Sequence, residues 1–212
     1  IGLLVYFLQP PSEESLRARA EKLMNNKDRL SYINARDYYL NPLLERYPDG
    51  QHAAWARSQL DIIDMDEAET LMERHNRFNQ DPTSEGERRY SEARKYERFG
   101  DRITALEKYK AFVELYKDKE EERPYVNLSL RQIQEIESEP PDKAKLLELL
   151  QVKLDEADRL FEGGDVVRAK KIWDSILSLY NGNAEMVAVV SRAQARIDRM
   201  REASQGPVSS PR

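Results

Sequence analysis

Few residues of this 212-residue chain could perform acid–base or metal chemistry. Only two histidines occur, His52 and His75, and neither has a second histidine or a glutamate at the helical spacing that a zinc site needs. Carboxylates are concentrated in one stretch, at Asp61, Asp64, Asp66, Glu67 and Glu69. Paired carboxylates can act as acid and base where a pocket separates their pKa values, but on an amphipathic helix such a run is usually the solvated face. We therefore expect surface histidines and a solvated acidic run, with no catalytic residue, no metal site and no cofactor.

The motifs of common enzyme and nucleotide-binding classes are also missing from the sequence. It has no cysteine, which removes disulfides, thiolate metal sites and cysteine nucleophiles. It has no Walker loop, no Gly-rich kinase loop, no His-Arg-Asp and no Asp-Phe-Gly. Two pairs, Gly100-Asp101 and Gly164-Asp165, could cradle a phosphate. Because they recur in matching surroundings, a structural turn whose aspartate caps the next helix is the favoured interpretation.

Charge does not point to a nucleic-acid partner. The chain has 34 Lys and Arg residues against 39 Asp and Glu residues, a formal net charge of −5, which excludes a strongly basic nucleic-acid binder. Local basic clusters such as Arg94-Lys95 and the group Arg168, Lys170 and Lys171 are interrupted by acidic residues. We therefore expect no nucleic-acid partner.

Aromatic residues are the remaining candidates for a binding surface. Most of them recur at repeat positions, where we expect them to be core residues. Tyr38, Tyr90 and Tyr125 lie off that pattern and could form an exposed surface, because aromatic residues and arginines dominate interaction hot spots. These three tyrosines are the predicted interaction residues. The predicted partner is a protein, a peptide or a second copy of the chain.

Helices must position these residues, because the sequence has helical periods and no convincing strand. Apolar residues recur at spacings of three and four in Ala105, Tyr109, Phe112, Val113 and Tyr116, and again in Leu146, Leu149, Leu150 and Leu154. Predicted helix starts lie at Ser12 with Ser15, at 81–85 and at 140–142, and predicted ends at Gly100, Gly163-Gly164 and Asn181-Gly182-Asn183. The predicted fold class is all-α.

The most informative feature is an internal repeat. The segment from Glu92 to Tyr116 aligns with the segment from Glu156 to Tyr180 at a constant offset of 64 residues, and seven of 25 positions are identical. A third, looser copy comprises Ala20, Leu23, Ala35, Tyr39, Leu43 and Tyr47, with an inter-helix loop predicted from Asn25 to Ser31. Each hairpin is followed by another helix with a related pattern. Repeated units that each bury one face on a neighbour are typical of solenoids.

Three repeat units therefore nearly fill the chain. The predicted organisation is the end of a transmembrane helix plus a linker in 1–11, repeat units in 12–81, 82–139 and 140–202, and a disordered tail in 203–212.

The repeated residues resemble the tetratricopeptide repeat, a helix-turn-helix unit of ~34 residues. The resemblance assigns structural roles to Ala93, Tyr96, Gly100, Asp101, Ala105 and Tyr109, and to Ala157, Leu160, Gly164, Asp165, Ala169 and Trp173. In each copy these are, in order, the small and the larger residue of the first helix, the two turn residues, and the small and the aromatic residue of the second helix. Arg89, Lys153, Phe112 and Ile176 depart from the family's pattern, and no proline closes either unit. The resemblance implies tetratricopeptide-like hairpins in a short solenoid.

The amino-terminal segment suggests a membrane anchor. Residues 1–8 are an apolar run, followed by Gln9-Pro10-Pro11, and could be the last third of a transmembrane helix. An apolar strap on the helical body or the end of a signal-peptide core are the alternatives. Glu13 and Glu14 follow, with no basic residue before Arg17, so the positive-inside rule favours an extracytoplasmic repeat region.

A second resemblance covers the whole chain. The apolar opening with Gln9 to Ser12, the segment 35–48 and the run from Glu120 to Pro124 look like the region after the membrane span in some large bacterial transmembrane serine/threonine protein kinases. The resemblance implies an upstream cytoplasmic kinase domain, which alone would use ATP and magnesium, and a sensory or docking role for the repeat region outside. The alternative is a cytosolic tetratricopeptide-like scaffold or adaptor with no kinase attached.

Overall fold

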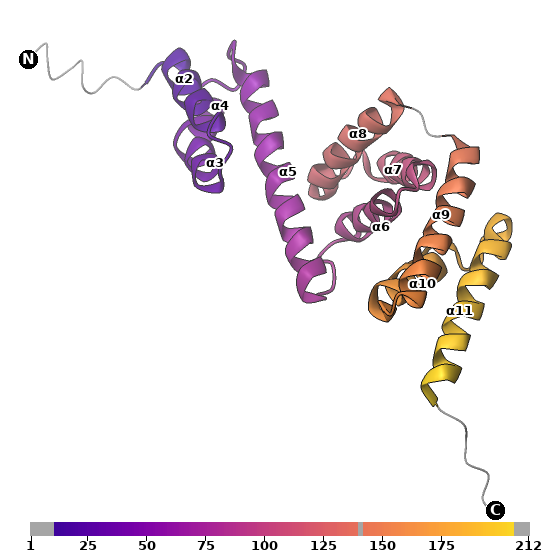
Figure 1. Ribbon diagram of the computed structural model, residues 1–212. Helices are drawn as coiled ribbons and strands as arrows, with labels where there is room; N and C mark the ends of the chain where they lie inside the picture. Colours follow the sequence, from indigo (N-terminus) through magenta and orange to yellow (C-terminus); the bar gives the residue numbers. More distant parts are fainter. Residues whose placement is uncertain (1–10, 140–141, 206–212) are drawn as a thin grey trace, which may run out of the picture. The chain divides into compact units, whose positions relative to one another are not determined.

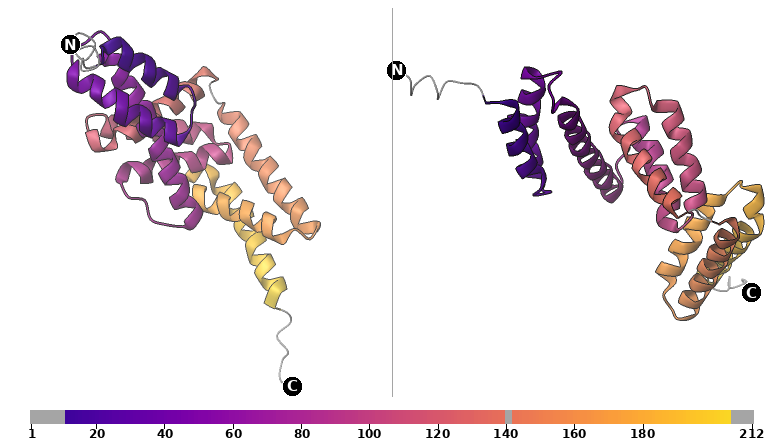
Figure 2. Two further views of the ribbon diagram at one scale, coloured as in Figure 1. Left: turned by 90° about the vertical axis from the view of Figure 1, so that its left-hand side faces the viewer. Right: turned by 90° about the horizontal axis from the view of Figure 1, so that it is seen from above.

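The computed structural model describes residues 11–139 and 142–205, and every secondary-structure element among them is a helix (Figures 1 and 2). The predicted all-α fold class is therefore confirmed. The α-helices are α2 (Glu13–Met24), α3 (Arg29–Ala35), α4 (Asn41–Arg46), α5 (Ala53–Phe78), α6 (Glu85–Phe99), α7 (Arg102–Tyr116), α8 (Arg123–Ser138), α9 (Lys143–Glu162), α10 (Val166–Tyr180) and α11 (Val187–Gln205). Short segments η1 (Arg36–Leu40), η2 (Glu120–Glu122) and η3 (Ala184–Met186) join some of them.

The helices group into two compact units. Compact unit 1 comprises Ile1–Arg88 and Phe112–Leu130, and compact unit 2 comprises Arg89–Ala111 and Arg131–Arg212. This grouping by contacts differs from the three repeat units, whose boundaries stay a prediction.

Several helix ends follow directly from local sequence. The Ser12 hydroxyl accepts a hydrogen bond from the Ser15 N–H at 3.3 Å, so α2 begins at Glu13 as predicted. Helices α6 and α9 begin at the predicted sites, and α6, α9 and α10 end immediately before the predicted glycine-containing stops. The predicted loop from Asn25 to Ser31 is too long, because Asp28 accepts from the Ser31 N–H at 3.0 Å and starts α3 at Arg29.

The two Gly-Asp pairs form the same turn in both copies. Gly100 and Gly164 have φ values of +103° and +85°, in the region that favours glycine. The N–H groups of Asp101 and Asp165 donate to the carbonyls of Tyr96 and Leu160, at 2.9 and 2.8 Å, in the Schellman arrangement that ends a helix. Their side chains then accept from the Thr104 and Arg168 N–H groups, at 2.9 and 3.1 Å, and cap the next helix. Each pair thus ends one helix and starts the next.

In compact unit 1, α2 and the segment α3–η1–α4 form a hairpin against the first half of α5 (Figures 1 and 2). The second half of this hairpin bends into one π-helical turn at η1. Pro42 has no N–H, and its ring would clash with the carbonyl four residues earlier, which accounts for the altered bonding before it. The hairpin core consists of Leu16, Ala20, Met24, Ala35, Leu40, Leu43, Ala56 and Ile63.

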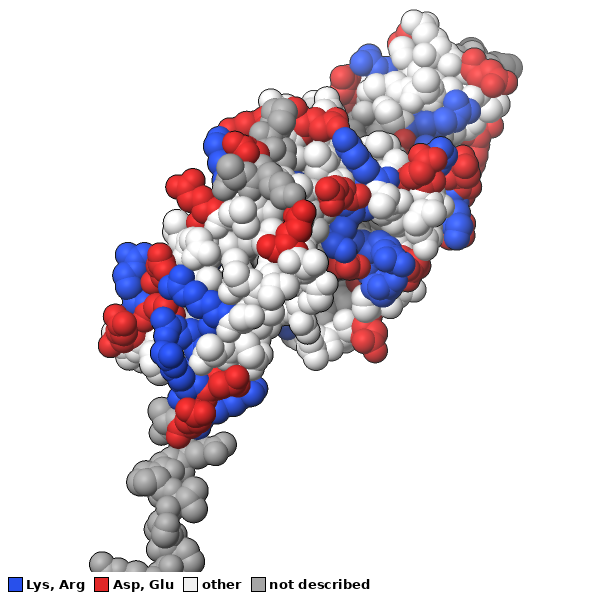
Figure 3. Space-filling view, turned by 90° about the vertical axis from the view of Figure 1, so that its right-hand side faces the viewer, with Lys and Arg blue, Asp and Glu red and all other residues white. Residues whose placement is uncertain are grey.

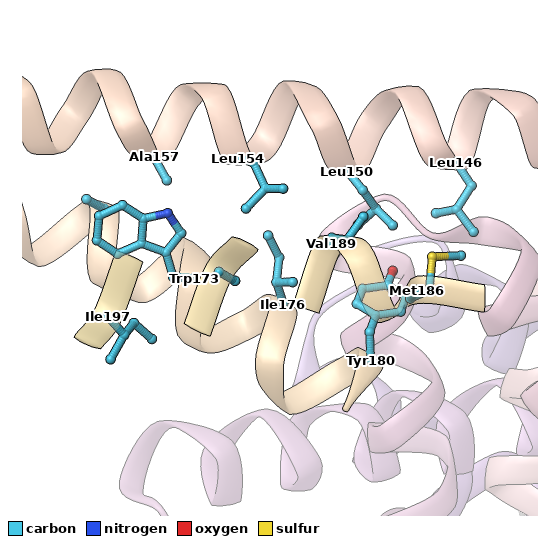
Figure 4. Packing of buried hydrophobic residues seen from close by; sticks show 12 residues of the cluster. Leu146, Leu150, Leu154, Ala157, Trp173, Ile176, Tyr180, Met186, Val189 and Ile197 are labelled. Atoms are coloured by element: carbon cyan, nitrogen blue, oxygen red, sulfur yellow. The ribbon is translucent and has the colours of Figure 1, made fainter. Parts of the chain in front are cut away.

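In compact unit 2, α9, α10 and α11 enclose one apolar core (Figure 4). Leu146, Leu150, Leu154 and Ala157 lie along one face of α9, at intervals of three or four residues. They face Trp173, Ile176 and Tyr180 of α10, together with Met186, Val189 and Ile197 of the following segment. The predicted stripe of leucines in α9 is therefore its core face.

Two predictions concern the ends of the chain, where the described residues begin and end. Helix α11 continues to Gln205 and so includes the first three residues of the predicted tail, 203–205. The remaining tail, 206–212, and the apolar segment 1–8 lie outside the described residues.

We predict that Gly100→Ala destabilises compact unit 2 more than Gly164→Ala does. A residue with a Cβ in the left-handed region costs roughly 1–2 kcal/mol at either position. At Gly100 the new Cβ would also lie 2.8 Å from Leu149 Cδ2, whereas at Gly164 nothing lies within 4 Å, so we expect roughly 1 kcal/mol more at Gly100. The measurement is urea unfolding followed by Trp173 emission in a Trp55→Phe background. Equal losses at both positions would contradict this account.

Candidate interaction groove

Helix α10 has two contrasting faces. Its inner face consists of Ala169, Trp173, Ile176 and Tyr180, all buried. Its outer face carries Val167, Lys171 and Ser178, spaced by four and seven residues, so they lie in one row along the helix. Val167 is 81% exposed, compared with 50% for Val152 and 58% for Val187.

An open groove of about 940 Å³ lies along this outer face. Its lining comes from α6, α10 and α11, and all the lining residues belong to compact unit 2. Apolar lining residues are Phe99, Val166, Val167, Leu179 and Met200, and charged or polar ones are Lys95, Arg98, Lys170, Lys171, Asp174, Ser175 and Ser178. This volume is near the top of the ~300–1,000 Å³ range of ligand sites.

An aromatic junction holds α6 against α10 beside the groove. The Tyr96 hydroxyl donates to the Leu179 carbonyl at 2.7 Å, and its ring meets the Tyr180 ring edge-on with centroids 5.9 Å apart. Phe99 also packs against Tyr180, at 6.1 Å between ring centroids. Such pairs contribute about 0.5–1.5 kcal/mol beyond the area that they bury. These contacts therefore hold α6 and α10, which form the two walls of the groove, in position against each other.

A buried carboxylate anchors this junction. The Tyr180 hydroxyl donates to Asp101 Oδ2 at 2.8 Å, while Oδ1 of the same carboxylate caps α7. Asp101 is fully buried. Burial raises the pKa of the Tyr180 hydroxyl, and the negative Asp101 carboxylate raises it further, so the hydroxyl stays protonated and can donate. Its counterpart Asp165 instead pairs with Arg168 at the surface.

Basic charge on the groove is only partly neutralised. Lys170 forms an ion pair with Asp174 on its own helix. Lys95 and Lys171 form no ion pair with any residue that the structure describes. On the face drawn in Figure 3, basic side chains gather at one end with acidic side chains beside them.

Of the three tyrosines predicted to form an interaction surface, only Tyr38 is exposed, at 67%. Tyr90 is fully buried and packs against Tyr109, with the two rings tilted by 42° and their centroids 5.6 Å apart. Tyr125 is buried too, and its hydroxyl donates to the Ala68 carbonyl at 3.4 Å. The expectation of exposure is therefore wrong for Tyr90 and Tyr125, because their large rings fill the interior of their own compact units. A role for Tyr38 in binding stays a prediction.

The residues assigned by the repeat resemblance take equivalent positions in both copies. Ala93, Ala105, Tyr109, Ala157, Ala169 and Trp173 are buried, and Tyr96 and Leu160 are half-buried. They form core and turns, and Tyr96 also supports the groove wall.

His75 is not the solvated surface residue that its charged neighbours suggested. It is 7% exposed, and its Nδ1 lies 2.6 Å from Glu87 Oε1. Asn79 ends α5 in the left-handed conformation, and the chain returns so that the Thr83 N–H and hydroxyl both donate to Glu87 Oε2, at 2.8 Å. His52 is half-buried, and its N–H donates to Glu13 Oε1 at 2.6 Å.

Two members of the acidic run in α5 form ion pairs with arginines of other segments. Asp61 pairs with Arg123 at 2.8 Å and Glu67 with Arg36 at 3.0 Å. Partial burial raises the pKa of Asp64, and nearby Glu67 adds to the rise. Within residues 11–139 and 142–205, no group of three or more histidine or acidic side chains is arranged to hold a metal ion.

Most groove residues could not be identified from their local sequence. The basic group at 168–171 was visible, but its relation to Lys95, Arg98 and Phe99 was not. The one feature of the sequence that could have indicated the groove was Val167, an apolar residue that does not belong to the inner face of α10.

The comparisons with known proteins add no family to this description. Protein-family models, curated proteins and solved structures all give no match to the chain. Among the helices that the structure describes, none has the length and apolar character to cross a bilayer.

We predict that Tyr180→Phe destabilises compact unit 2 by about 1.5–3 kcal/mol, because it removes a hydrogen bond to a buried carboxylate. The control is Tyr38→Phe, at an exposed tyrosine, for which we expect a change within about 0.5 kcal/mol. Urea unfolding followed by Trp173 emission in a Trp55→Phe background measures both. A loss at Tyr180 no larger than at Tyr38 would refute the anchoring role of Asp101.

We also predict that the Glu87 carboxylate makes compact unit 1 sensitive to acid. Burial favours a higher pKa for Glu87, but hydrogen bonds from Thr83 and His75 outweigh it and leave the pKa below its ordinary value. A carboxyl with a lowered folded-state pKa stabilises the fold above its unfolded pKa, and this stability is lost as the pH falls through the folded pKa.

The free energy of unfolding should therefore fall between about pH 5 and pH 3, with a smaller slope in Glu87→Gln. Glu85→Gln, at an exposed Arg88 pair on the same helix, should keep the original slope. Urea titrations followed by Trp55 emission, in a Trp173→Phe background, measure these slopes. Identical slopes in the two variants would show that Glu87 does not carry the effect.

Proposed function

We propose that the chain is a non-catalytic, tetratricopeptide-like helical repeat module that binds a protein or peptide, and that the groove on the outer face of α10 is its binding surface. The observation that carries this proposal is the combination of an open 940 Å³ groove with an apolar floor and a valine that is 81% exposed. Binding sites are typically concave and combine apolar contact area with a small number of polar groups.

The groove chemistry favours binding over catalysis. Its one carboxylate, Asp174, is paired with Lys170, and the Ser175 hydroxyl donates to the Lys171 carbonyl of its own helix at 2.8 Å. General base catalysis needs an available base within hydrogen-bonding reach of a nucleophile. The described lining residues offer hydrophobic contact and positive charge instead.

The repeat character of the module is supported by two turns built in the same way. Gly100-Asp101 and Gly164-Asp165 share the positive φ, the helix-ending hydrogen bond and the aspartate cap. Hairpins of one design, each with a buried alanine in both helices, favour a short solenoid of tetratricopeptide-like units.

We propose the membrane-anchored, extracytoplasmic part of a bacterial serine/threonine protein kinase as the setting of this module. Its support is the sequence resemblance and the apolar segment 1–8, which lies outside the described residues. The alternative proposal is a cytosolic scaffold or adaptor. The coding sequence upstream of Ile1 decides between them: a kinase domain followed by about 12 further apolar residues supports the first, and a nearby start codon supports the second.

We predict that a random peptide library displayed on phage yields peptides whose binding depends on the groove. Val167→Glu should weaken their binding at least roughly tenfold, because it places a charge on the apolar floor. The matched control is Val152→Glu, at an exposed valine of α9 outside the groove, which should bind as the original chain does. Fluorescence anisotropy measures the dissociation constants.

Two outcomes would count against the proposed function. One is a selection that enriches no peptide above background. The other is a set of peptides whose affinity changes equally in Val167→Glu and Val152→Glu, which would place their binding elsewhere.

A further inference from the structure

We infer that the segment bound in the groove is an acidic amphipathic helix, whose apolar residues lie on the groove floor and whose carboxylates pair with Lys95 and Lys171. This inference rests on the proposed function and adds the chemistry of the partner.

Charge on the rim supplies the first argument. Lys95 comes from α6 and Lys171 from α10, so the unneutralised ammonium groups belong to two different helices of the lining. Neither has a carboxylate partner among the described residues, whereas Lys170 has Asp174. A partner with carboxylates would meet complementary charge, and a basic partner would be repelled.

The length of the groove along α10 supplies the second argument. From Val167 to Ser178 the outer face of α10 runs for 11 residues, about 16 Å at the helical rise of ~1.5 Å per residue. A helix lying beside it would present three turns, with apolar anchors at positions i, i+3 or i+4, and i+7. Phe99, Val167 and Met200 provide apolar contacts from three helices for such anchors.

An anionic membrane surface would also attract the basic residues of the groove, but it would not fit the shape of the groove. Interfacial membrane binding buries a convex apolar face into the headgroup region. Here the apolar residues line a groove, which fits an inserted helix better. The membrane alternative is therefore treated as an outcome of the test.

The test uses three synthetic peptides of about 18 residues, longer than the ~12–15 residues that an isolated helix needs. All three carry leucine at i, i+3, i+4 and i+7 and alanine at the positions between. They differ only at the remaining positions, which are Glu in the first peptide, Gln in the second and Lys in the third. Fluorescence anisotropy with the full chain measures each dissociation constant. We expect the Glu peptide to bind at least roughly tenfold more tightly than the Gln and Lys peptides, with affinity that falls as salt rises.

Charge reversal supplies matched variants. Lys95→Glu/Lys171→Glu should weaken binding of the Glu peptide roughly tenfold or more and shift the preference to the Lys peptide. Arg19→Glu/Lys22→Glu makes the same change in net charge on the exposed face of α2 and should leave the preference unchanged. Far-UV circular dichroism verifies that both double variants remain helical.

The outcomes separate this inference from the function on which it rests. Equal affinity for the Glu and Gln peptides, lost in Val167→Glu, overturns the acidic partner but keeps the groove as a binding surface. No binding of any peptide, together with a failed library selection, overturns both. Co-sedimentation with phosphatidylserine vesicles that depends on Lys95 and Lys171, without binding of the Glu peptide, would assign the charge to a membrane and overturn the inference.

Discussion

The buried carboxylate of Asp101 is the constraint on which compact unit 2 depends. Its backbone N–H closes the end of α6, one carboxylate oxygen caps α7, and the other accepts from Tyr180 on α10. A buried carboxylate is costly unless donors surround it, so these bonds must form together. The turn of one hairpin thereby fixes the last turn of a helix in the next.

This constraint determines which face of α10 is available. With Tyr180 held inward, residues 4, 7 and 11 positions earlier also face the core, and the intervening positions must face out. Val167 and Lys171 are therefore exposed because of the register that the core imposes on the helix. The same contacts place Phe99 and Lys95 of α6 along the groove. The inner face thus supplies stability, and the outer face is the surface on which we propose that a partner binds.

Local patterns were sufficient to predict much of the fold. Helix ends at Gly100, Gly164 and Ser12 depend on residues within a few positions, and the sequence predicts them well. Burial of His75 could not be predicted in the same way, because its partner Glu87 reaches it only after the chain reverses at Asn79. The groove was hidden for a related reason. Its walls lie about 70 residues apart in the sequence, and only the aromatic junction brings them together.

The most direct test of this account is a crystal structure of the chain with a peptide selected for binding. We expect the peptide to bind as a helix along the outer face of α10. Its apolar side chains should contact Phe99 and Val167, and one of its carboxylates should lie near Lys171. A peptide bound on another surface, for example beside the exposed Tyr38, with the α10 groove open to solvent, would contradict it.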